Sequence, residues 1–283
     1  MERFDSPHYR SILRMVNKPA RYVGGELNAI DKSCDFFSLP RAERVHFALC
    51  FPDLYEIGMS NLAIQVLYSA LNCEDHVFCE RCFAPDVDLC ILLRERHLPI
   101  VSIETMTPLN EFDIIGFSLH YELAYTAVLE MLDLAVIPLY AEDRGENDPL
   151  VVAGGPIACN LEPVAPFFDL IMIGDGEYHL PQLVQEYRKC KMENLSKSYF
   201  LHKVCGMDGV YVPSFYEPQY RDDGRINGIK VIEPDAPKSV RKALVRDFDL
   251  ALIPKSPIVP NIEVTHDRMI IEIFRGCARG CRF

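Results

Sequence analysis

The sequence predicts an α/β protein built on a doubly wound, mostly parallel β-sheet. Short apolar runs alternate along the chain with helical patterns of about ten to fifteen residues, which is typical of βαβ units. Strands of a parallel sheet are covered by helices on both faces, and this favours runs as apolar as Val-His-Phe-Ala-Leu-Cys-Phe at 45–51. A chain of 283 residues is long enough for about two domains with a substantial core.

The expected elements follow one another in strand-then-helix order. The predicted strands are 45–51, 77–79, 114–119, 150–155 and 170–174. Helical patterns follow four of them, at 59–71, 85–97, 124–135 and 178–189, and a short irregular stretch follows the strand at 150–155. Right-handed crossovers between such units give an open, doubly wound sheet.

Four regions are expected along the chain. Residues 1–40 form a helical lead-in, and 41–192 form the α/β domain. Residues 193–266 form a β-containing extension, with a hairpin at Asp223-Gly224, and a proline-rich connector. Residues 267–283 begin with a strand at 269–274 and end in a cysteine-containing loop.

Composition excludes several classes of protein. A net charge of -12 argues against binding to nucleic acid or to an anionic membrane through bulk charge. No apolar run approaches the roughly 18 residues of a spanning helix, and the first residues lack the apolar region of a signal peptide. Eleven unevenly scattered cysteines do not form a disulfide framework. We therefore expect a cytoplasmic protein with reduced thiols.

Cys277 and Cys281 are the most informative residues. They lie in a loop directly after the apolar run 269–274, with Gly276 and Gly280 for flexibility and an aromatic residue at Phe283. Thiolates on a flexible loop suit an iron–sulfur cluster, which takes sulfur ligands from several directions. Two ordinary thiols are the alternative, and the strand-then-loop context favours ligands.

The segment 271–283 closely resembles the cluster loop of radical S-adenosylmethionine enzymes. Upstream segments resemble a group of these proteins whose reaction is uncharacterised and whose N-terminal region is cobalamin-binding-like: 51–61, 112–122, 154–156, 174–177 and 257–260. The resemblance implies that Cys277 and Cys281 are ligands of a [4Fe-4S] cluster, and that Phe283 packs near the adenine side of S-adenosylmethionine. By this resemblance the third cysteine would follow Phe283, and we expect residues 267–283 to be the start of a barrel that this sequence does not complete.

The same resemblance raises the question of cobalamin. Asp53, Tyr55 and Gly58 stand where cobalamin domains with a protein lower ligand carry Asp-x-His-x-x-Gly. A phenol with a pKa of about 10 is a poor cobalt ligand, so cobalamin would be held without a histidine lower ligand. Ser118 and the Gly154-Gly155 pair resemble later elements of the pattern, at a different spacing. Retained cobalamin binding and a vestigial scaffold both stay open.

Other candidate groups have simpler interpretations. Cys79 and Cys82 fit neither a zinc site, for lack of further ligands, nor a redox motif, so we expect buried, inert thiols. The acidic turn 174–177 caps a helix and would repel phosphate. Among the isolated histidines, His120 beside Ser118 at the end of a strand is the one to follow.

The resemblance implies an intact protein that reduces S-adenosylmethionine and abstracts hydrogen from an unknown small-molecule or macromolecular substrate. With two cluster thiolates, this chain alone is expected to be catalytically incompetent. Two alternatives are a module that binds a corrinoid or a substrate, and a structural domain that docks to a separate barrel.

Overall fold

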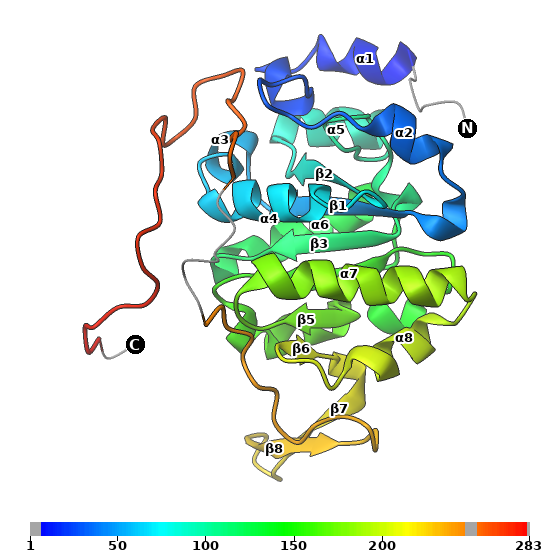
Figure 1. Cartoon of the computed structure of the whole chain (residues 1–283), viewed down its shortest axis with the longest axis vertical. Helices are drawn as coiled ribbons and strands as arrows, with labels where there is room; N and C mark the ends of the chain where they lie inside the picture. The colour runs from blue at the N-terminus through cyan, green and yellow to red at the C-terminus, as the bar shows by residue number, and fades with distance from the viewer. Residues whose placement is uncertain (1–6, 247–253, 282–283) are drawn as a thin grey trace.

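A six-stranded sheet in the order β2-β1-β3-β4-β5-β6 forms the middle layer of the computed structural model, which describes residues 7–246 and 254–281 (Figure 1). The first five strands are parallel, and β6 runs antiparallel to β5. The strands are β1 (Val45–Phe51), β2 (Val77–Phe83), β3 (Ile114–Ser118), β4 (Leu150–Gly154), β5 (Leu170–Met172) and β6 (Val210–Tyr211). The predicted class, a mostly parallel α/β sheet, is confirmed.

Helices cover both faces of the sheet. One face packs against α4 (Leu62–Asn72), α7 (Gly176–Met192) and α8 (Lys197–Val204), and the other against α1 (Pro7–Leu13), α5 (Val87–Arg96) and α6 (Tyr125–Leu134). Two short helices are α2 (Ser33–Ser38) and α3 (Tyr55–Gly58). The 3-10 turns are Pro19–Tyr22, Arg41–Glu43, Leu109–Glu111, Glu122–Ala124, Ala141–Asp143, Ala158–Asn160, Glu162–Phe167 and Pro213–Phe215.

Strand β1 shows why the sheet forms from these residues. All of its side chains are buried, and successive ones point to opposite faces. Phe47 and Leu49 enter the core beneath α4 and α7, while Ala48 and Cys50 enter the core beneath α5 and α6. A central strand with two apolar faces is stabilised only when helices cover both, which accounts for the three layers.

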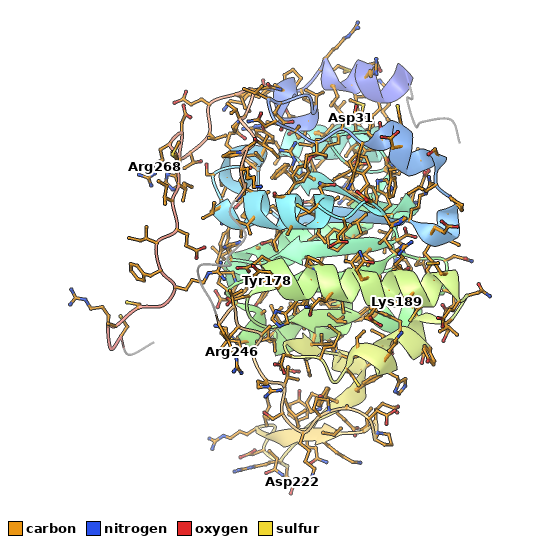
Figure 2. The ribbon with its side chains drawn as sticks, viewed as in Figure 1. Asp31, Tyr178, Lys189, Asp222, Arg246 and Arg268 are labelled. Carbon is orange, nitrogen blue, oxygen red and sulfur yellow. The ribbon has the colours of Figure 1, made fainter. Side chains whose placement is uncertain are left out.

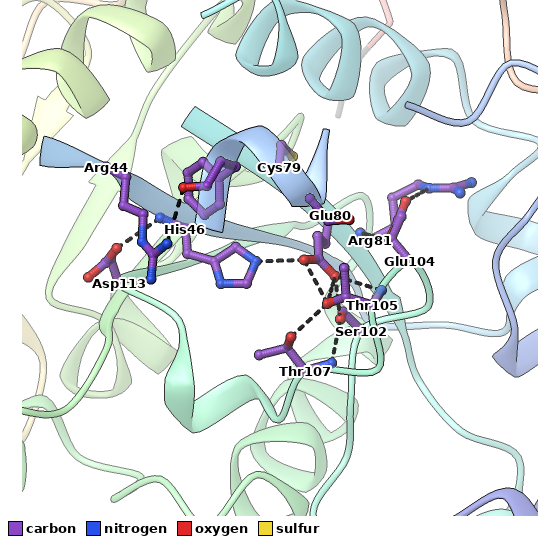
Figure 3. Close-up of polar contacts among 12 residues, drawn as sticks. Arg44, His46, Cys79, Glu80, Arg81, Ser102, Glu104, Thr105, Thr107 and Asp113 are labelled. Atoms are coloured by element: carbon purple, nitrogen blue, oxygen red, sulfur yellow. Dashed lines mark hydrogen bonds and ion pairs between the residues drawn. The ribbon is translucent and has the colours of Figure 1, made fainter. Parts of the chain in front are cut away.

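Strand β2 extends to Phe83, whereas the sequence predicts its end at Cys79. The prediction ended there because two charged residues follow. Glu80 and Arg81 are both fully buried at an edge of the sheet (Figure 3). The Glu80 carboxylate accepts hydrogen bonds from Ser102 Oγ at 2.6 Å and from the Thr105 amide at 3.0 Å. Arg81 donates from Nε to Glu104 at 2.6 Å. These partners come from a distant loop, so the apolar pattern alone could not include the pair.

The cysteines that flank this pair are buried free thiols, as expected. Cys79 belongs to the core on the α4 side and Cys82 to the core on the α5 side. Residues three apart in a strand point to opposite faces, so these two sulfurs do not meet at one site.

The predicted hairpin also forms. Strands β7 (Tyr216–Tyr220) and β8 (Ile226–Val231) pair antiparallel across a turn in which Gly224 has a φ of +79°. Asp222 marks its tip, which projects away from the main sheet (Figure 2). This small second sheet agrees with the expected β-containing extension.

After the hairpin the chain returns along the outside of α4. Ile258 exchanges two hydrogen bonds with the Gln65 side chain, at 3.0 and 3.2 Å. The strand predicted at 269–274 is wrong: these residues are irregular, and Met269 is 84% and Ile273 75% exposed. A strand needs a neighbour for its backbone hydrogen bonds, and no described strand lies beside this segment.

None of the helices within residues 7–246 and 254–281 combines the length and the apolarity needed to cross a membrane.

Candidate ligand-binding site

A cavity of about 470 Å³ lies between the sheet and the helices α4 and α7, reaching the carboxyl ends of the strands. Its apolar walls are formed by Phe47, Leu49, Leu62, Ala63, Val66, Leu67, Val152, Met172 and Leu180. Few polar side chains face it, chiefly Ser118 at the end of β3, His120 just after it and a cluster of charged residues at the mouth. A mostly apolar hollow with a few polar groups is the usual form of a small-molecule site.

The topology of the sheet explains where this cavity lies. The chain passes from β1 to β2 on one side and then to β3 on the other side of β1, so the strand order reverses between β1 and β3. Helices on the two sides diverge at such a point and leave a crevice outside the carboxyl ends. Gly116 of β3 leaves room for the Phe47 ring, since a Cβ there would lie 2.5 Å from it.

Ser118 and His120 form a hydrogen-bonded pair in the cavity wall. Ser118 Oγ lies 3.1 Å from His120 Nε2, and Asn61 Nδ2 lies 3.4 Å from His120 Nδ1. Asn61 also caps α4, because its Oδ1 accepts from the Ala63 amide at 2.9 Å. Burial, partly against the Phe51 ring, lowers the pKa of His120, so its neutral form predominates near neutral pH.

The Gly154-Gly155 pair lines the same cavity at the end of β4. Gly155 has a φ of +111°, and a Cβ there would lie 2.2 Å from the Leu119 carbonyl oxygen. The Leu119 amide donates to the Gly154 carbonyl at 2.8 Å. The close approach that demands glycine is therefore between two strand ends, and it shapes the cavity wall.

The mouth of the cavity is formed by the turn after β5. Gly174, with a φ of +119°, allows the Ala243 backbone to pair beside it as an isolated parallel bridge. Asp175 and Glu177 then meet Arg275 from the C-terminal segment, at 3.4 and 2.5 Å between charged atoms. Glu272 and Lys242 complete the charged rim. The acidic turn thus binds an arginine of its own chain.

The residues that correspond to Asp-x-His-x-x-Gly lie outside the cavity. Asp53, Tyr55 and Gly58 do not line the cavity. Asp53 accepts a hydrogen bond from the Tyr121 hydroxyl. Tyr55 is 1% exposed and donates to Glu26 Oε1 at 2.9 Å, and burial raises the pKa of its phenol. These interactions hold α3 in place and leave the phenol protonated.

Cys277 and Cys281 are free and exposed in the C-terminal segment. Cys277 lies two residues beyond Arg275, so that arginine ties the cysteine loop to the cavity mouth. Within the described residues, no three His, Cys, Asp or Glu side chains are grouped to hold a metal ion. Two thiolates suit iron–sulfur ligation in type but do not complete a three-thiolate set. Phe283 lies outside the described residues.

Of the predicted residues, the structure brings Ser118, Gly154 and Gly155 together at one cavity, with His120 beside them. Asn61 and Arg275 were not among the site residues predicted from the sequence. The part of α4 in the cavity wall could have been predicted from the sequence. Its apolar residues recur at helical spacing on one face: Leu62, Ala63, Val66 and Leu67.

Comparison with known proteins decides the family. A family model described as "Radical SAM proteins, N-terminal" matches residues 63–213, which is more than half of the chain. The chain belongs to this family. An uncharacterized protein of Methanocaldococcus jannaschii is 26% identical over 243 residues, an alignment that covers 83% of this chain and 40% of the relative. The chain therefore spans less than half the length of that relative. No solved structure matches.

Proposed function

We propose that this chain is the ligand-holding N-terminal part of a radical S-adenosylmethionine protein, and that the cavity at the carboxyl edge of its sheet holds a small molecule. The observation that carries the proposal is the cavity itself: about 470 Å³, apolar, at the switch point between β1 and β3. Three residues of the cobalamin-like pattern, Ser118, Gly154 and Gly155, line it.

A corrinoid is the first candidate for the ligand. A cavity of this size takes a molecule of drug size, so a whole corrinoid would extend beyond its mouth. The cobalt would receive no ligand from Tyr55, since that phenol is buried, protonated and bonded to Glu26. A substrate of the intact protein is the second candidate, favoured by the arginine that ties the cysteine loop to the mouth.

In the intact protein, by family membership, Cys277 and Cys281 would supply two thiolates to a [4Fe-4S] cluster, and the cluster would supply the electron that cleaves S-adenosylmethionine. This chain contributes binding and orientation. With two thiolates in the loop, we propose that it has no radical activity alone.

Titration of the chain with hydroxocobalamin, followed by absorbance, tests whether a corrinoid is the ligand. Saturable binding with a spectrum that shows no histidine coordination supports it. Hydroxocobalamin that is not retained by millimolar protein in equilibrium dialysis counts against a corrinoid and leaves the substrate as the ligand.

A further inference from the structure

The cavity wall contains a hydrogen-bond chain with a fixed direction. The Ala63 amide donates to Asn61 Oδ1 at 2.9 Å, which orients the Asn61 amide. Its Nδ2, a donor only, therefore points to His120 Nδ1 at 3.4 Å. A ring nitrogen that accepts a hydrogen bond carries no proton, and a neutral imidazole has one N–H. The proton of His120 is thus on Nε2.

This tautomer decides the role of Ser118. His120 Nε2–H donates to Ser118 Oγ across 3.1 Å, so the serine hydroxyl is the acceptor in that pair. Its own proton is free to point elsewhere. Ser118 is 5% exposed and lines the cavity, whose walls are mostly apolar. A hydroxyl donor is therefore presented to an apolar hollow.

We infer that the cavity selects a neutral, largely apolar ligand that places a hydrogen-bond acceptor, such as a heteroaromatic nitrogen or a carbonyl oxygen, against Ser118. Asn61 and His120 are positioning residues that set the direction of the donor. This inference rests on the proposed function, that the cavity binds a small molecule. A buried donor left without an acceptor costs free energy, so a ligand without an acceptor is disfavoured.

Two planar probes of nearly equal shape test the selection. Quinoline carries an acceptor nitrogen, and naphthalene carries none. We expect the chain to prefer quinoline, and Ser118→Ala to reduce the ratio of the two dissociation constants by roughly fivefold, the range of one net hydrogen bond. Ser38→Ala, at an exposed position at the end of α2, should leave the ratio unchanged. An unchanged ratio in Ser118→Ala would overturn the inference.

The donor and acceptor roles along Asn61, His120 and Ser118 can also be tested without any ligand. Long-range ¹H–¹⁵N NMR at pH 8 should show His120 as the Nε2–H tautomer, assigned by loss of its signals in His120→Gln. Asn61→Asp keeps the helix cap but offers only acceptors. It should move the proton to Nδ1, turn Ser118 into a donor toward His120, and abolish the preference for quinoline. An Nδ1–H tautomer in the unaltered chain would contradict the inference.

The outcomes separate this inference from the proposed function. If neither probe binds, the inference fails, and the hydroxocobalamin titration still judges the corrinoid. If quinoline selection follows Ser118 while hydroxocobalamin does not bind, the inference stands and the corrinoid is excluded as the ligand.

Discussion

Arg275 Nη2 forms an ion pair with the buried Glu177 carboxylate at 2.5 Å, and this contact joins the C-terminal segment to the mouth of the cavity. Glu177 opens α7 at the cavity mouth, and Arg275 lies two residues before Cys277. The Glu177 side chain is 5% exposed, so loss of its partner would leave a buried charge. This ion pair therefore holds the cysteine loop next to the cavity mouth.

Glu177→Gln should loosen the C-terminal segment, because a neutral amide replaces the carboxylate that forms the ion pair with Arg275. We expect trypsin to cleave after Arg268 and Arg275 severalfold faster than in the unaltered chain, since local opening governs proteolysis. Glu186→Gln, which removes the ion pairs of another α7 carboxylate with Lys189 and Lys203 and leaves the partners of Arg275 in place, is the matched control. Equal cleavage rates in all three proteins would show that the ion pair does not hold the segment.

Gly155→Ala should destabilise the fold. Its Cβ would lie 2.2 Å from the Leu119 carbonyl at a φ of +111°. We expect a loss of about 2 kcal/mol or more in the free energy of unfolding, measured with urea. Gly206→Ala meets nothing within 4 Å and should change stability by less than about 0.5 kcal/mol. A Gly155→Ala protein as stable as that control would refute the close approach.

Glu104 should make stability depend on pH. Burial raises the pKa of its carboxyl from 4.5 to about 7, with Arg81 opposing and Glu80 adding to the shift. The native carboxyl holds its proton more tightly than the unfolded one, so its stabilising contribution is present below about pH 4.5 and is lost as pH rises through about 7.

The comparison with Glu104→Gln isolates this effect, because glutamine does not titrate. Between pH 4.5 and 8, the unaltered chain should lose on the order of 3 kcal/mol of unfolding free energy relative to the variant. If the difference in unfolding free energy between the two proteins stays constant over this range, Glu104 is ionised throughout. The ion pair with Arg81 at 2.6 Å would then outweigh the effect of burial.

The cysteine loop should not hold a stable cluster in this chain. After anaerobic reconstitution with iron and sulfide, we expect the iron content to match that of a Cys277→Ala/Cys281→Ala variant, and no 5'-deoxyadenosine from S-adenosylmethionine. Stoichiometric iron that disappears in the double variant, or any clear turnover, would contradict the proposed inactivity of the chain alone.

The fold could be predicted from the sequence where local pattern and tertiary role agree. The apolar runs of β1 and β3 are buried on both faces, so their composition alone indicates parallel strands. The pattern failed where long-range partners decide. Glu80 and Arg81 stay in β2 because residues 102–105 and Glu26 satisfy them.

The site was predictable in part for the same reason. Ser118 and Gly154 stand at strand ends, where parallel sheets bind ligands, and both line the cavity. The part played by Asn61 depends on a distance of 3.4 Å to a residue far along the chain. Residues 269–274 show the opposite case, since their apolar pattern suggested a strand for which the described chain offers no neighbour.

The most direct test of the account fills the cavity and measures binding. Ala63 lines the cavity from α4, whereas Ala127 lies in α6 on the other face of the sheet. Hydroxocobalamin should bind the unaltered chain and Ala127→Phe with equal affinity, and binding to Ala63→Phe should fall at least tenfold, a loss of about 1.4 kcal/mol. Equal binding by all three proteins would contradict the claim that this cavity holds the ligand.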